Sequence, residues 1–247
     1  MKDMFLTDRK LDRRITEVKK YRYRNIRNLE EFAVQEDLQG VVNPQVPAEF
    51  DNWDTIHTGD CWSGRDRYLW MHKDIEIPAQ WKGQRVVGIF DFGNTGAGNN
   101  SGFEAMCYID GKPYQGVDVN HKEVFFPEEF CGKTVNLTFR LWSGLEGGGV
   151  PAVQEHKIRQ ADLACLDEQA DDFYYMGTLS LDTIANLEDG NPVKYDLRNA
   201  LDQACHCIDW SYPGSEAFYE SLHQADQILA EILSGRLYQQ RCGDCFR

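Results

Sequence analysis

The chain has 247 residues, and with 42% of them hydrophobic it can form one large domain or one domain with helical extensions. Forty acidic residues against 26 basic ones give a formal net charge of -14 at pH 7, so the field of the whole chain repels phosphate backbones and anionic membranes. Composition therefore argues against nucleic acid and against lipid as partners.

The amino-terminal residues contain no apolar core of the length that a signal peptide has, and no later apolar run is long enough to cross a bilayer. We therefore expect a protein of the cytoplasm. The eight cysteines are then expected to remain reduced thiols. The glycosylation patterns at Asn99 and Asn136 have no meaning in that compartment.

Residues 8–37 repeat apolar side chains every three or four positions among many Lys, Arg and Glu residues, which predicts an amphipathic helix. The apolar positions are Leu11, Ile15, Val18, Ile26, Leu29 and Phe32. Pro44 and Pro47 then interrupt any helix, because proline removes a backbone donor and disfavours helical geometry in the residue before it. We expect an N-terminal helical segment over residues 1–44.

The pattern changes near residue 51 to short runs with a period of two, separated by turn residues, which is typical of β-strands. Residues 86–92 are apolar at nearly every position, as expected for a strand covered on both sides. Asp110–Gly111 suits the positive φ angles of a tight hairpin turn. Two sets of alternating residues predict inward strand faces: Leu69, Met71, Ile75 and Ile77, and Val135, Leu137, Phe139 and Leu141.

Several short strands with such turns predict an antiparallel β-sandwich or jelly roll over residues 45–167. No strand-helix-strand alternation occurs there, which excludes a dinucleotide-binding fold and a TIM barrel. After residue 167 the period becomes helical again, with segments near 168–187, 194–210 and 215–234. The last segment places apolar residues on one stripe and is expected to end at a cap formed by Gly235. That stripe contains Phe218, Leu222, Ala225, Leu229 and Ile232.

The predicted fold class is therefore α+β, with a galactose-binding-like sandwich between an N-terminal helix and a C-terminal helical segment over residues 168–247. The glycines of residues 93–98 resemble a phosphate-binding fingerprint, but they lead into another strand rather than into a helix. We expect a flexible loop there. For residues 147–149 we expect added backbone freedom at the end of a strand.

Metal ligation is suggested by the CxxC spacing of Cys242 and Cys245 and by the run Cys205-His206-Cys207. A structural zinc site needs four ligands that converge, usually from two closely spaced pairs. Two cysteines at positions i and i+2 of a helix point to different sides, so Cys205 and Cys207 do not form half of such a site. We expect buried thiols and no metal.

Aromatic faces that stack on sugar C–H surfaces, together with planar polar groups that bind hydroxyls, are typical of carbohydrate sites. The side chains of these types around the Gly59–Trp70 stretch and the Gly111–His121 stretch are Trp62, Arg65, Asp66, Trp70, Tyr114, Asp118, Asn120 and His121. They are candidates for carbohydrate binding. The alternative is that the tryptophans fill the edge of the sandwich and that Arg65 pairs with an acid to fix a loop.

Four blocks of the sequence, in this order and spacing, resemble the N-terminal region of glycoside hydrolase family 38 α-mannosidases of the cytosolic and bacterial type. The blocks are Trp62–Asp66 with Trp70, Ile75–Gly83, Tyr108–Asp118 and Asn120–Val124. Weaker similarity to the helices that precede the catalytic domain in that family lies at Phe173–Tyr175, Asn199–Asp209 and Phe218–Ser221.

The resemblance implies a retaining mannosidase in which a zinc ion binds the sugar hydroxyls and an aspartate is the nucleophile. In the family these groups belong to a catalytic domain that opens with a His-x-Asp motif just after the helices. The match to that motif here is His72-Lys73-Asp74, which lies within a predicted strand and lacks the family's flanking segments. We interpret it as a coincidence, so we expect no catalytic residue, no metal and no cofactor in this chain, and zinc in the missing catalytic domain.

The sequence thus predicts an ancillary N-terminal part of an α-mannosidase, an enzyme that hydrolyses terminal α-mannosides, with the catalytic domain as its partner. Two alternatives stay open. One is a stand-alone carbohydrate-binding module that stacks mannosides on Trp62, Trp70 and Tyr114. The other is a helical interaction domain, in which an exposed apolar patch would favour a homo-oligomer.

Overall fold

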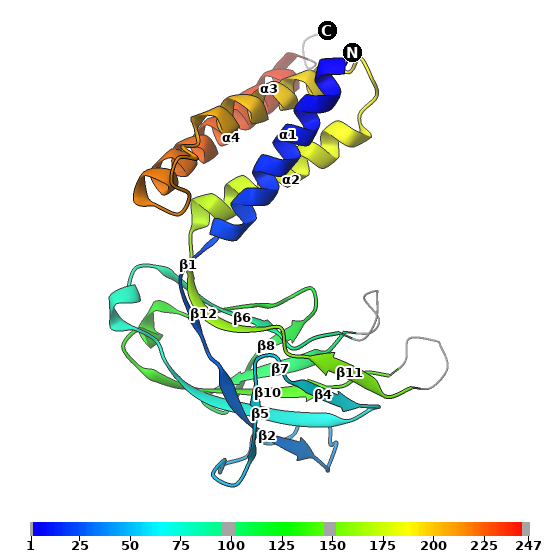
Figure 1. The fold of residues 1–247 in the computed structure, drawn as a ribbon, viewed down its shortest axis with the longest axis vertical. Coiled ribbons are helices and arrows are strands. Elements are labelled where there is room, and N and C mark those ends of the chain that lie inside the picture. Colours follow the sequence, from blue (N-terminus) through cyan, green and yellow to red (C-terminus); the bar gives the residue numbers. More distant parts are fainter. Residues whose placement is uncertain (1, 95–101, 146–151, 244–247) are drawn as a thin grey trace. The chain divides into compact units, whose positions relative to one another are not determined.

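The computed structural model describes residues 2–94, 102–145 and 152–243, without the side chains of residues 2–6 and 236–243. The chain divides into two compact units, one formed by Met1–Arg24 with Leu166–Arg247 and the other by Asn25–Cys165 (Figure 1). The chain therefore crosses from one unit to the other twice, and each unit has its own hydrophobic core.

The second unit is built on a six-stranded sheet with the strand order β3-β2-β5-β10-β7-β8. All neighbouring strands of this sheet run antiparallel. Its strands are β2 (Glu31–Asp37), β3 (Asp54–His57), β5 (Tyr68–Glu76), β7 (Glu104–Ile109), β8 (Lys112–Asp118) and β10 (Thr134–Trp142).

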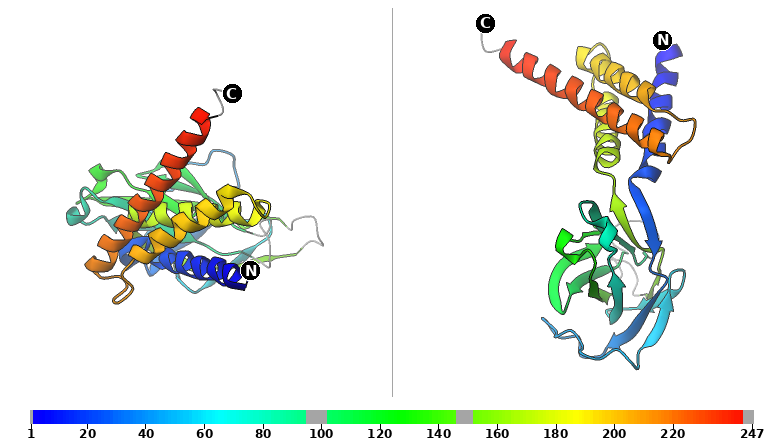
Figure 2. Two further views of the ribbon diagram at one scale, coloured as in Figure 1. Left: turned by 90° about the horizontal axis from the view of Figure 1, so that it is seen from above. Right: turned by 90° about the vertical axis from the view of Figure 1, so that its left-hand side faces the viewer.

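A four-stranded sheet with the order β1-β12-β6-β9 forms the opposite layer of the sandwich (Figure 2). In a separate two-stranded sheet, β4 pairs with β11. These strands are β1 (Tyr23–Asn28), β4 (Cys61–Gly64), β6 (Arg85–Asp91), β9 (Glu123–Phe125), β11 (Gln154–Lys157) and β12 (Gln160–Leu166). Short 3-10 turns at Ala79–Trp81 and Glu128–Phe130 connect some of them. The prediction of an antiparallel sandwich is confirmed.

The sandwich core lies between the two large sheets, and the predicted inward face of β10 is confirmed. Val135, Leu137, Phe139 and Leu141 are at most 1% exposed. The rings of Phe90 and Phe139 lie 4.6 Å apart, centroid to centroid, in an edge-to-face contact that favours aromatic pairs. Residues 86–92 are all buried, as the apolar run predicts.

The predicted hairpin turn is also confirmed. Asp110 and Gly111 connect β7 to β8 with φ angles of 50° and 73°. Both angles are positive, which is the requirement of the two-residue turn whose twist matches that of the strands.

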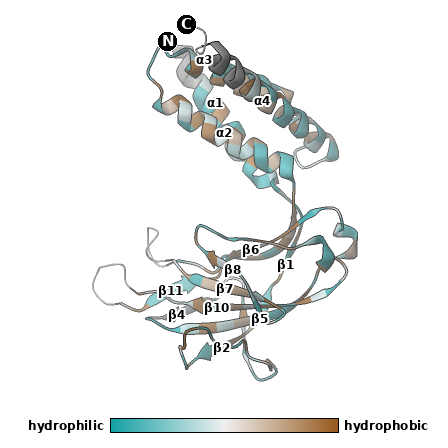
Figure 3. Ribbon diagram, turned by 180° about the vertical axis from the view of Figure 1, so that it is seen from behind, coloured by the Kyte–Doolittle hydropathy of each residue, from teal (hydrophilic) through white to brown (hydrophobic). Residues whose placement is uncertain are grey.

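The first unit contains four helices: α1 (Lys2–Val18), α2 (Glu168–Asn186), α3 (Pro192–Cys207) and α4 (Glu216–Gly243), with a 3-10 turn at Lys19–Tyr21. Hydrophobic and hydrophilic positions alternate along α1 and α2 (Figure 3). Leu11, Ile15 and Val18 turn one stripe of α1 into the core, at the spacing that a helix requires. Phe218, Leu222, Ala225 and Leu229 of α4 are buried and Ile232 packs against the same cluster, so the predicted stripe is confirmed.

The prediction of a helical cap at Gly235 is wrong, because α4 continues through this residue to Gly243. A glycine inside a helix costs only about 1 kcal/mol relative to alanine, which the flanking helix-forming residues offset. No helix within the part of the chain that the structure describes is long and apolar enough to span a bilayer.

The helix predicted over residues 8–37 is wrong beyond Tyr21, because residues 23–28 and 31–37 form β1 and β2. Glu30 has a φ angle of 35°, which a helix does not allow. Leu29 lies in the connection between β1 and β2 and Phe32 lies on β2, and both residues enter the sandwich core. Hydrogen bonding between strands and burial against the sandwich outweigh local helical preference here. The loops predicted at residues 95–98 and 147–149 lie outside the described residues.

Candidate functional site

Trp62, the first of the candidate sugar-binding tryptophans, belongs to the core of the sandwich. Its side chain is 7% exposed and its Nε1 donates a hydrogen bond to the carbonyl oxygen of Phe92 at 2.8 Å. One face of the indole stacks on His156, with ring centroids 4.5 Å apart. Burial lowers the pKa of His156, against the effect of hydrogen bonds with the backbone at Ser143 and Gly93. The ring of Trp62 therefore packs in the interior of the sandwich, which agrees with the alternative that the tryptophans fill the sandwich rather than bind sugar.

Tyr114, Asp118, Asn120 and His121 lie on β8 and in the turn that follows it. The hydroxyl of Tyr114 donates to the carbonyl oxygen of Phe125 at 2.6 Å, which ties β8 to β9 of the other layer. The backbone N–H groups of Asn120 and His121 donate to Oδ1 of Asp118 at 2.7 and 2.8 Å. These contacts give the residues a role in holding a turn.

The charge of Asp118 is set by the same turn. Burial alone would raise the pKa of this carboxyl group, but hydrogen bonds from the His121 ring and from the two backbone N–H groups outweigh burial and lower it. The ring nitrogen Nδ1 of His121 lies 3.0 Å from Oδ1 of Asp118. The carboxylate oxygens of Asp118 thus already have hydrogen-bond partners within the turn.

Asp66 and Trp70 lie on a different face, together with residues that the sequence did not single out. Trp70 is 4% exposed and its ring centroid lies 5.7 Å from that of Tyr108. Asp66 accepts a hydrogen bond from Nε1 of Trp142 at 2.9 Å, and the neighbouring Arg65 is exposed. The structure therefore does not gather the predicted residues into one site, but Asp66 and Trp70 each contact a residue that lines the groove described next.

The groove lies on the face of the six-stranded sheet that points away from the core. Arg140 of β10 is opposite Trp70 of β5 and Met106 of β7, so the three side chains share this outer face. The groove has a volume of about 650 Å³. It is lined by Asn43, Pro44, Gln45, Val46, Tyr68, Glu104, Ala105, Met106, Tyr108, Gly111, Pro113, Arg140 and Trp142. We call it the outer-face groove.

One wall of the outer-face groove is the segment 43–46, which belongs to the connection between β2 and β3. Further along this connection, Phe50 stacks on His72 of β5 with ring centroids 3.6 Å apart and an angle of 11° between the rings. Trp53 packs edge-on against Phe50 at 5.0 Å. These contacts anchor the connection on the outer face of the sheet.

Arg140 is held in the groove by Asp37. Its Nε and Nη2 lie 2.9 and 2.7 Å from Oδ2 of Asp37, whose other oxygen accepts from the backbone N–H groups of Gln39 and Gly40. The guanidinium carbon also lies 4.2 Å from the centre of the Tyr68 ring. Cation–π contact and a buried ion pair together give the guanidinium one orientation.

The pKa of Tyr108 responds to the same surroundings. Burial raises the pKa of its phenol, and the positive charge of Arg140 opposes that rise. The phenol is therefore neutral at pH 7 and able to donate a hydrogen bond.

The residues Tyr68, Met106, Arg140 and Trp142 escaped the sequence interpretation although a signal was present. Tyr68, Arg140 and Trp142 lie on β5 and β10, for which the period of two identified inward-pointing residues, and Met106 lies opposite Arg140 on β7. The alternate positions of the same strands carry an unusual set of aromatic and charged side chains for a solvent-facing surface. Considering the outward as well as the inward positions of β5 and β10 would have identified Tyr68, Arg140 and Trp142.

The His-x-Asp match is part of the sheet. His72 is 7% exposed, and its Nδ1 lies 3.1 Å from Oγ1 of Thr138. Burial lowers the pKa of His72, against the charge of Asp74 and a backbone hydrogen bond at Leu137. Asp74 is exposed, with Oδ1 at 3.7 Å from Nε2 of the histidine. The histidine is therefore engaged in packing between β10 and Phe50.

Of the two cysteines of α3, Cys205 is buried as expected, whereas Cys207 is exposed, so the expectation of buried thiols is wrong for Cys207. Burial, with a smaller effect from Asp202, raises the pKa of the Cys205 thiol to about 12. Within the described ranges, no group of three or more His, Cys, Asp and Glu residues could hold a metal ion. The CxxC pair of Cys242 and Cys245 lies outside the side chains that the structure describes.

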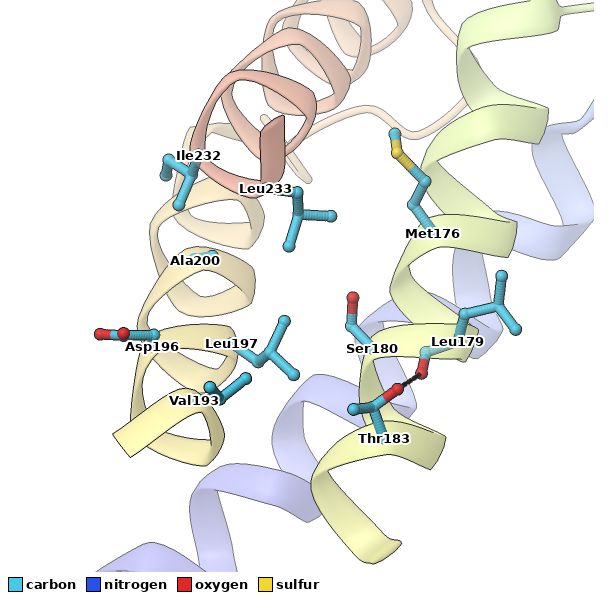
Figure 4. A pocket seen from close by; sticks show the side chains of 10 residues that line it. All are labelled: Met176, Leu179, Ser180, Thr183, Val193, Asp196, Leu197, Ala200, Ile232 and Leu233. Carbon is cyan, nitrogen blue, oxygen red and sulfur yellow. Dashed lines mark hydrogen bonds between the residues drawn. The ribbon is translucent and has the colours of Figure 1, made fainter. Parts of the chain in front are cut away.

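The helical unit contains a second hollow, an apolar groove of about 310 Å³ between α2, α3 and α4 (Figure 4). Leu197 of α3 and Leu233 of α4 point toward α2 (Figure 4). On α2, Oγ1 of Thr183 donates to the carbonyl oxygen of Leu179 at 2.8 Å, which leaves little polarity facing the groove. Leu179 itself is 65% exposed. We call this the helical groove.

Residues 32–142 match a family described as the α-mannosidase jelly roll domain. The predicted resemblance to the N-terminal region of a family 38 α-mannosidase is thereby confirmed, and so is the fold class, a jelly roll with flanking helices. Among curated proteins, no sequence matches the chain.

Some solved structures match part of the chain. A β-glucuronidase of Bacteroides uniformis matches with 13% identity and a TM-score of 0.41, over 57% of this chain and 18% of its own. A β-glucuronidase of Faecalibacterium prausnitzii matches with 14% identity and a TM-score of 0.39, over 58% of this chain and 32% of its own. The CBM51-2 and INT domains of ZmpB from Clostridium perfringens, in complex with GlcNAc, match with 11% identity and a TM-score of 0.23, over 86% of this chain and 44% of their own. The chain thus spans less than half the length of each of these proteins.

Proposed function

We propose that these 247 residues are an ancillary part of an α-mannosidase and assist the hydrolysis of terminal α-mannosides without cleaving the bond themselves. The observation that carries the proposal is the match of residues 32–142 to the α-mannosidase jelly roll domain. In this proposal the groups that break the glycosidic bond belong to a catalytic domain outside the 247 residues.

The position of His72 supports a structural role for this chain. A histidine that holds a zinc ion needs a free ring nitrogen and further ligands that converge on the same point. The ring of His72 is stacked beneath Phe50, and Nδ1 is near Thr138. The donors present in the described segments do not fit a zinc ion, so we assign no step of hydrolysis to them. Zinc would belong to the catalytic domain.

We further propose that the protein works in the cytoplasm. The described cysteines, Cys61, Cys107, Cys131, Cys165, Cys205 and Cys207, are all free thiols. Unpaired cysteines both on the surface and in two cores are typical of proteins in a reducing compartment.

The helical groove supports a contact between this unit and the catalytic domain. It is lined mainly by aliphatic side chains, and beside it Leu179 and Tyr175 are 65% and 48% exposed. Apolar surface that gathers around a hollow in this way is typical of a protein interface. Association of the chain with itself is the competing use of this surface, and light scattering across concentrations separates the two.

The experiment that tests the proposal is an assay with 4-nitrophenyl α-mannoside in the presence of zinc. The chain is purified alone and also together with the polypeptide encoded directly downstream of it. We expect turnover only in the second preparation, and we expect the downstream sequence to contain a His-x-Asp segment. Turnover by the purified chain alone, in amounts proportional to protein, would contradict a purely ancillary role, as would a downstream region without mannosidase activity.

A further inference from the structure

We propose that the outer-face groove is a binding site for one neutral hexose unit of an oligosaccharide. Trp142 supplies the stacking surface, and Arg140 and Tyr108 supply donors for the sugar hydroxyls. The proposal goes beyond an ancillary role, because it gives the sandwich a ligand of its own.

The outer-face groove combines apolar surface and polar groups in one hollow. Sugars present C–H faces that pack on aromatic rings, and hydroxyl groups that need planar, directional donors and acceptors. Trp142 and Met106 offer apolar surface in the groove, and Met106 is 40% exposed. Arg140, Glu104 and Asn43 line the same hollow with polar groups. A volume of about 650 Å³ lies within the usual range for small-molecule sites.

Contacts within the sandwich hold the polar and aromatic groups of the groove in place before a ligand binds. The side chains of Arg140 and Asp37 are 11% and 7% exposed, so the guanidinium is fixed before any ligand arrives. The hydrogen bond from Trp142 to Asp66 likewise holds the indole ring at the end of β10. Groups ordered in advance lose less entropy on binding, which favours even a weak ligand.

The groove also has a wall that the sheet alone would not provide. The segment 43–46 stands over the outer face and includes Pro44, whose fixed φ limits the conformations of the segment. The stack of Phe50 on His72 fastens the same connection to β5. The groove is thus concave, whereas the outer face of a sheet is ordinarily open to solvent.

Charge decides which class of sugar fits. Of the charged residues that line the groove, Arg140 is offset by Asp37 and Glu104 carries a negative charge, while the carboxylate of Asp66 lies against Trp142. The local balance is therefore negative, in a chain whose formal net charge is -14. Sugar phosphates, sulfates and uronic acids would be repelled, so the ligand is an uncharged hexose.

The test is a titration followed by nuclear magnetic resonance, observing the indole N–H signal of Trp142 in the full chain. The probes are methyl α-mannoside, methyl α-glucoside, mannose 6-phosphate and glucuronate. We expect a saturable shift of this signal with at least one neutral glycoside, and a Kd at least about tenfold weaker for the two anionic sugars.

Two variants and a control locate the site. Trp142→Ala removes the stacking ring and Met106→Trp fills the groove. Binding to the variants is followed by isothermal titration calorimetry, because Trp142→Ala lacks the observed indole signal, and each variant should bind about tenfold more weakly or worse. Tyr212→Ala removes an aromatic ring that is 79% exposed in the helical unit, and binding should not change. Circular dichroism and thermal melting of each variant establish that it is folded, and Met106→Trp keeps the test valid if Trp142→Ala does not fold.

Three results would overturn the proposal: no saturable shift with either neutral glycoside, binding that survives Met106→Trp, or an anionic sugar that binds as tightly as a neutral one. The choice of a mannoside as a probe rests on the proposed function. A groove that binds the glucoside and rejects the mannoside would uphold the hexose site and weaken the mannosidase assignment. Mannosidase activity from the joined polypeptides with an unresponsive groove would do the reverse.

Discussion

Arg140 on β10 and Asp37 at the end of β2 form an ion pair on the outer face of the six-stranded sheet, with Nη2 2.7 Å from Oδ2. The strand β5 lies between their two strands in the sheet order, so the pair reaches across a neighbouring strand. Removing one partner of a buried pair leaves the other charge uncompensated.

We therefore predict that Asp37→Ala destabilises the sandwich unit by on the order of 3 kcal/mol, measured by urea denaturation followed by tryptophan fluorescence. The matched control is Glu36→Ala at the next position, which removes an exposed ion pair with Arg67. Its effect should be much smaller, because solvent screens that pair. Equal losses of stability in the two variants would mean that the pair of Arg140 and Asp37 is not the source of the effect.

A second prediction concerns Trp62, which packs in the core. Trp62→Phe keeps an aromatic ring but removes the hydrogen bond from Nε1 to the carbonyl oxygen of Phe92. The buried carbonyl then loses its partner, which costs about 1–3 kcal/mol, and the melting temperature should fall accordingly. Binding of the neutral glycosides to the outer-face groove should remain within about twofold of the wild type, since less than 0.5 kcal/mol is at stake there. An unchanged melting temperature together with lost sugar binding would instead place a ligand on Trp62.

A third prediction concerns pH and Asp226 of α4. Burial, with a smaller effect from the charge of Asp172, raises the pKa of Asp226 from 3.8 to about 6, and His223 opposes the rise. A group whose pKa is higher in the folded state stabilises that state at low pH and loses this contribution as the pH rises through the folded value. Asp226→Asn should therefore raise the melting temperature at pH 7.5, and the gain should shrink as the pH falls below about 6.

The measurement for Asp226 is the difference in melting temperature between variant and wild type from pH 4 to pH 8. Asp182→Asn, at an exposed position of α2, is the control, and its difference should change little across that range. A gain for Asp226→Asn that stays constant from pH 5 to pH 8 would contradict the raised pKa.

A fourth prediction concerns Asp167, which caps α2. Its Oδ1 accepts from the backbone N–H of Ala170 at 3.0 Å and lies 2.8 Å from Nε2 of His223. Asp167→Ala should cost about 2 kcal/mol, at the upper end for an N-cap, because the contact with α4 is lost as well. Asn191→Ala removes a cap of α3 whose Oδ1 accepts from the backbone N–H of Val193, and it should cost about 1 kcal/mol. Calorimetric unfolding of the two variants gives the comparison, and the prediction fails if Asn191→Ala is the more damaging.

The local sequence was sufficient for β10 and for the hairpin turn between β7 and β8. Alternating apolar residues along β10 can be buried on one side only if the segment is extended, since successive side chains of a strand point to opposite faces. The Asp110–Gly111 turn was equally local, because few residue pairs tolerate two positive φ angles. The stripe on α4 followed from its period.

Residues 23–37 show where local pattern stopped being sufficient. The spacing of Leu29 and Phe32 suits a helix, but pairing of β1 with β12 and of β2 with β5 selected two strands with Leu29 between them. The same limit applies to the tryptophans. Trp62 and Trp142 have the same side chain, but the first packs against His156 in the core and the second lines a groove.

By itself, then, the sequence determined the class of the fold, the positions of the C-terminal helices and of several strands, and the resemblance to the α-mannosidase jelly roll, because these follow from periodicity and from contiguous motifs. Only the tertiary structure decided which aromatic rings reach a ligand and which groups surround Arg140. Those relationships join residues far apart in the chain, such as Asp37, Tyr68 and Arg140, and strand pairing brings them to one face. Strand register, which no short stretch of sequence encodes alone, is the physical reason.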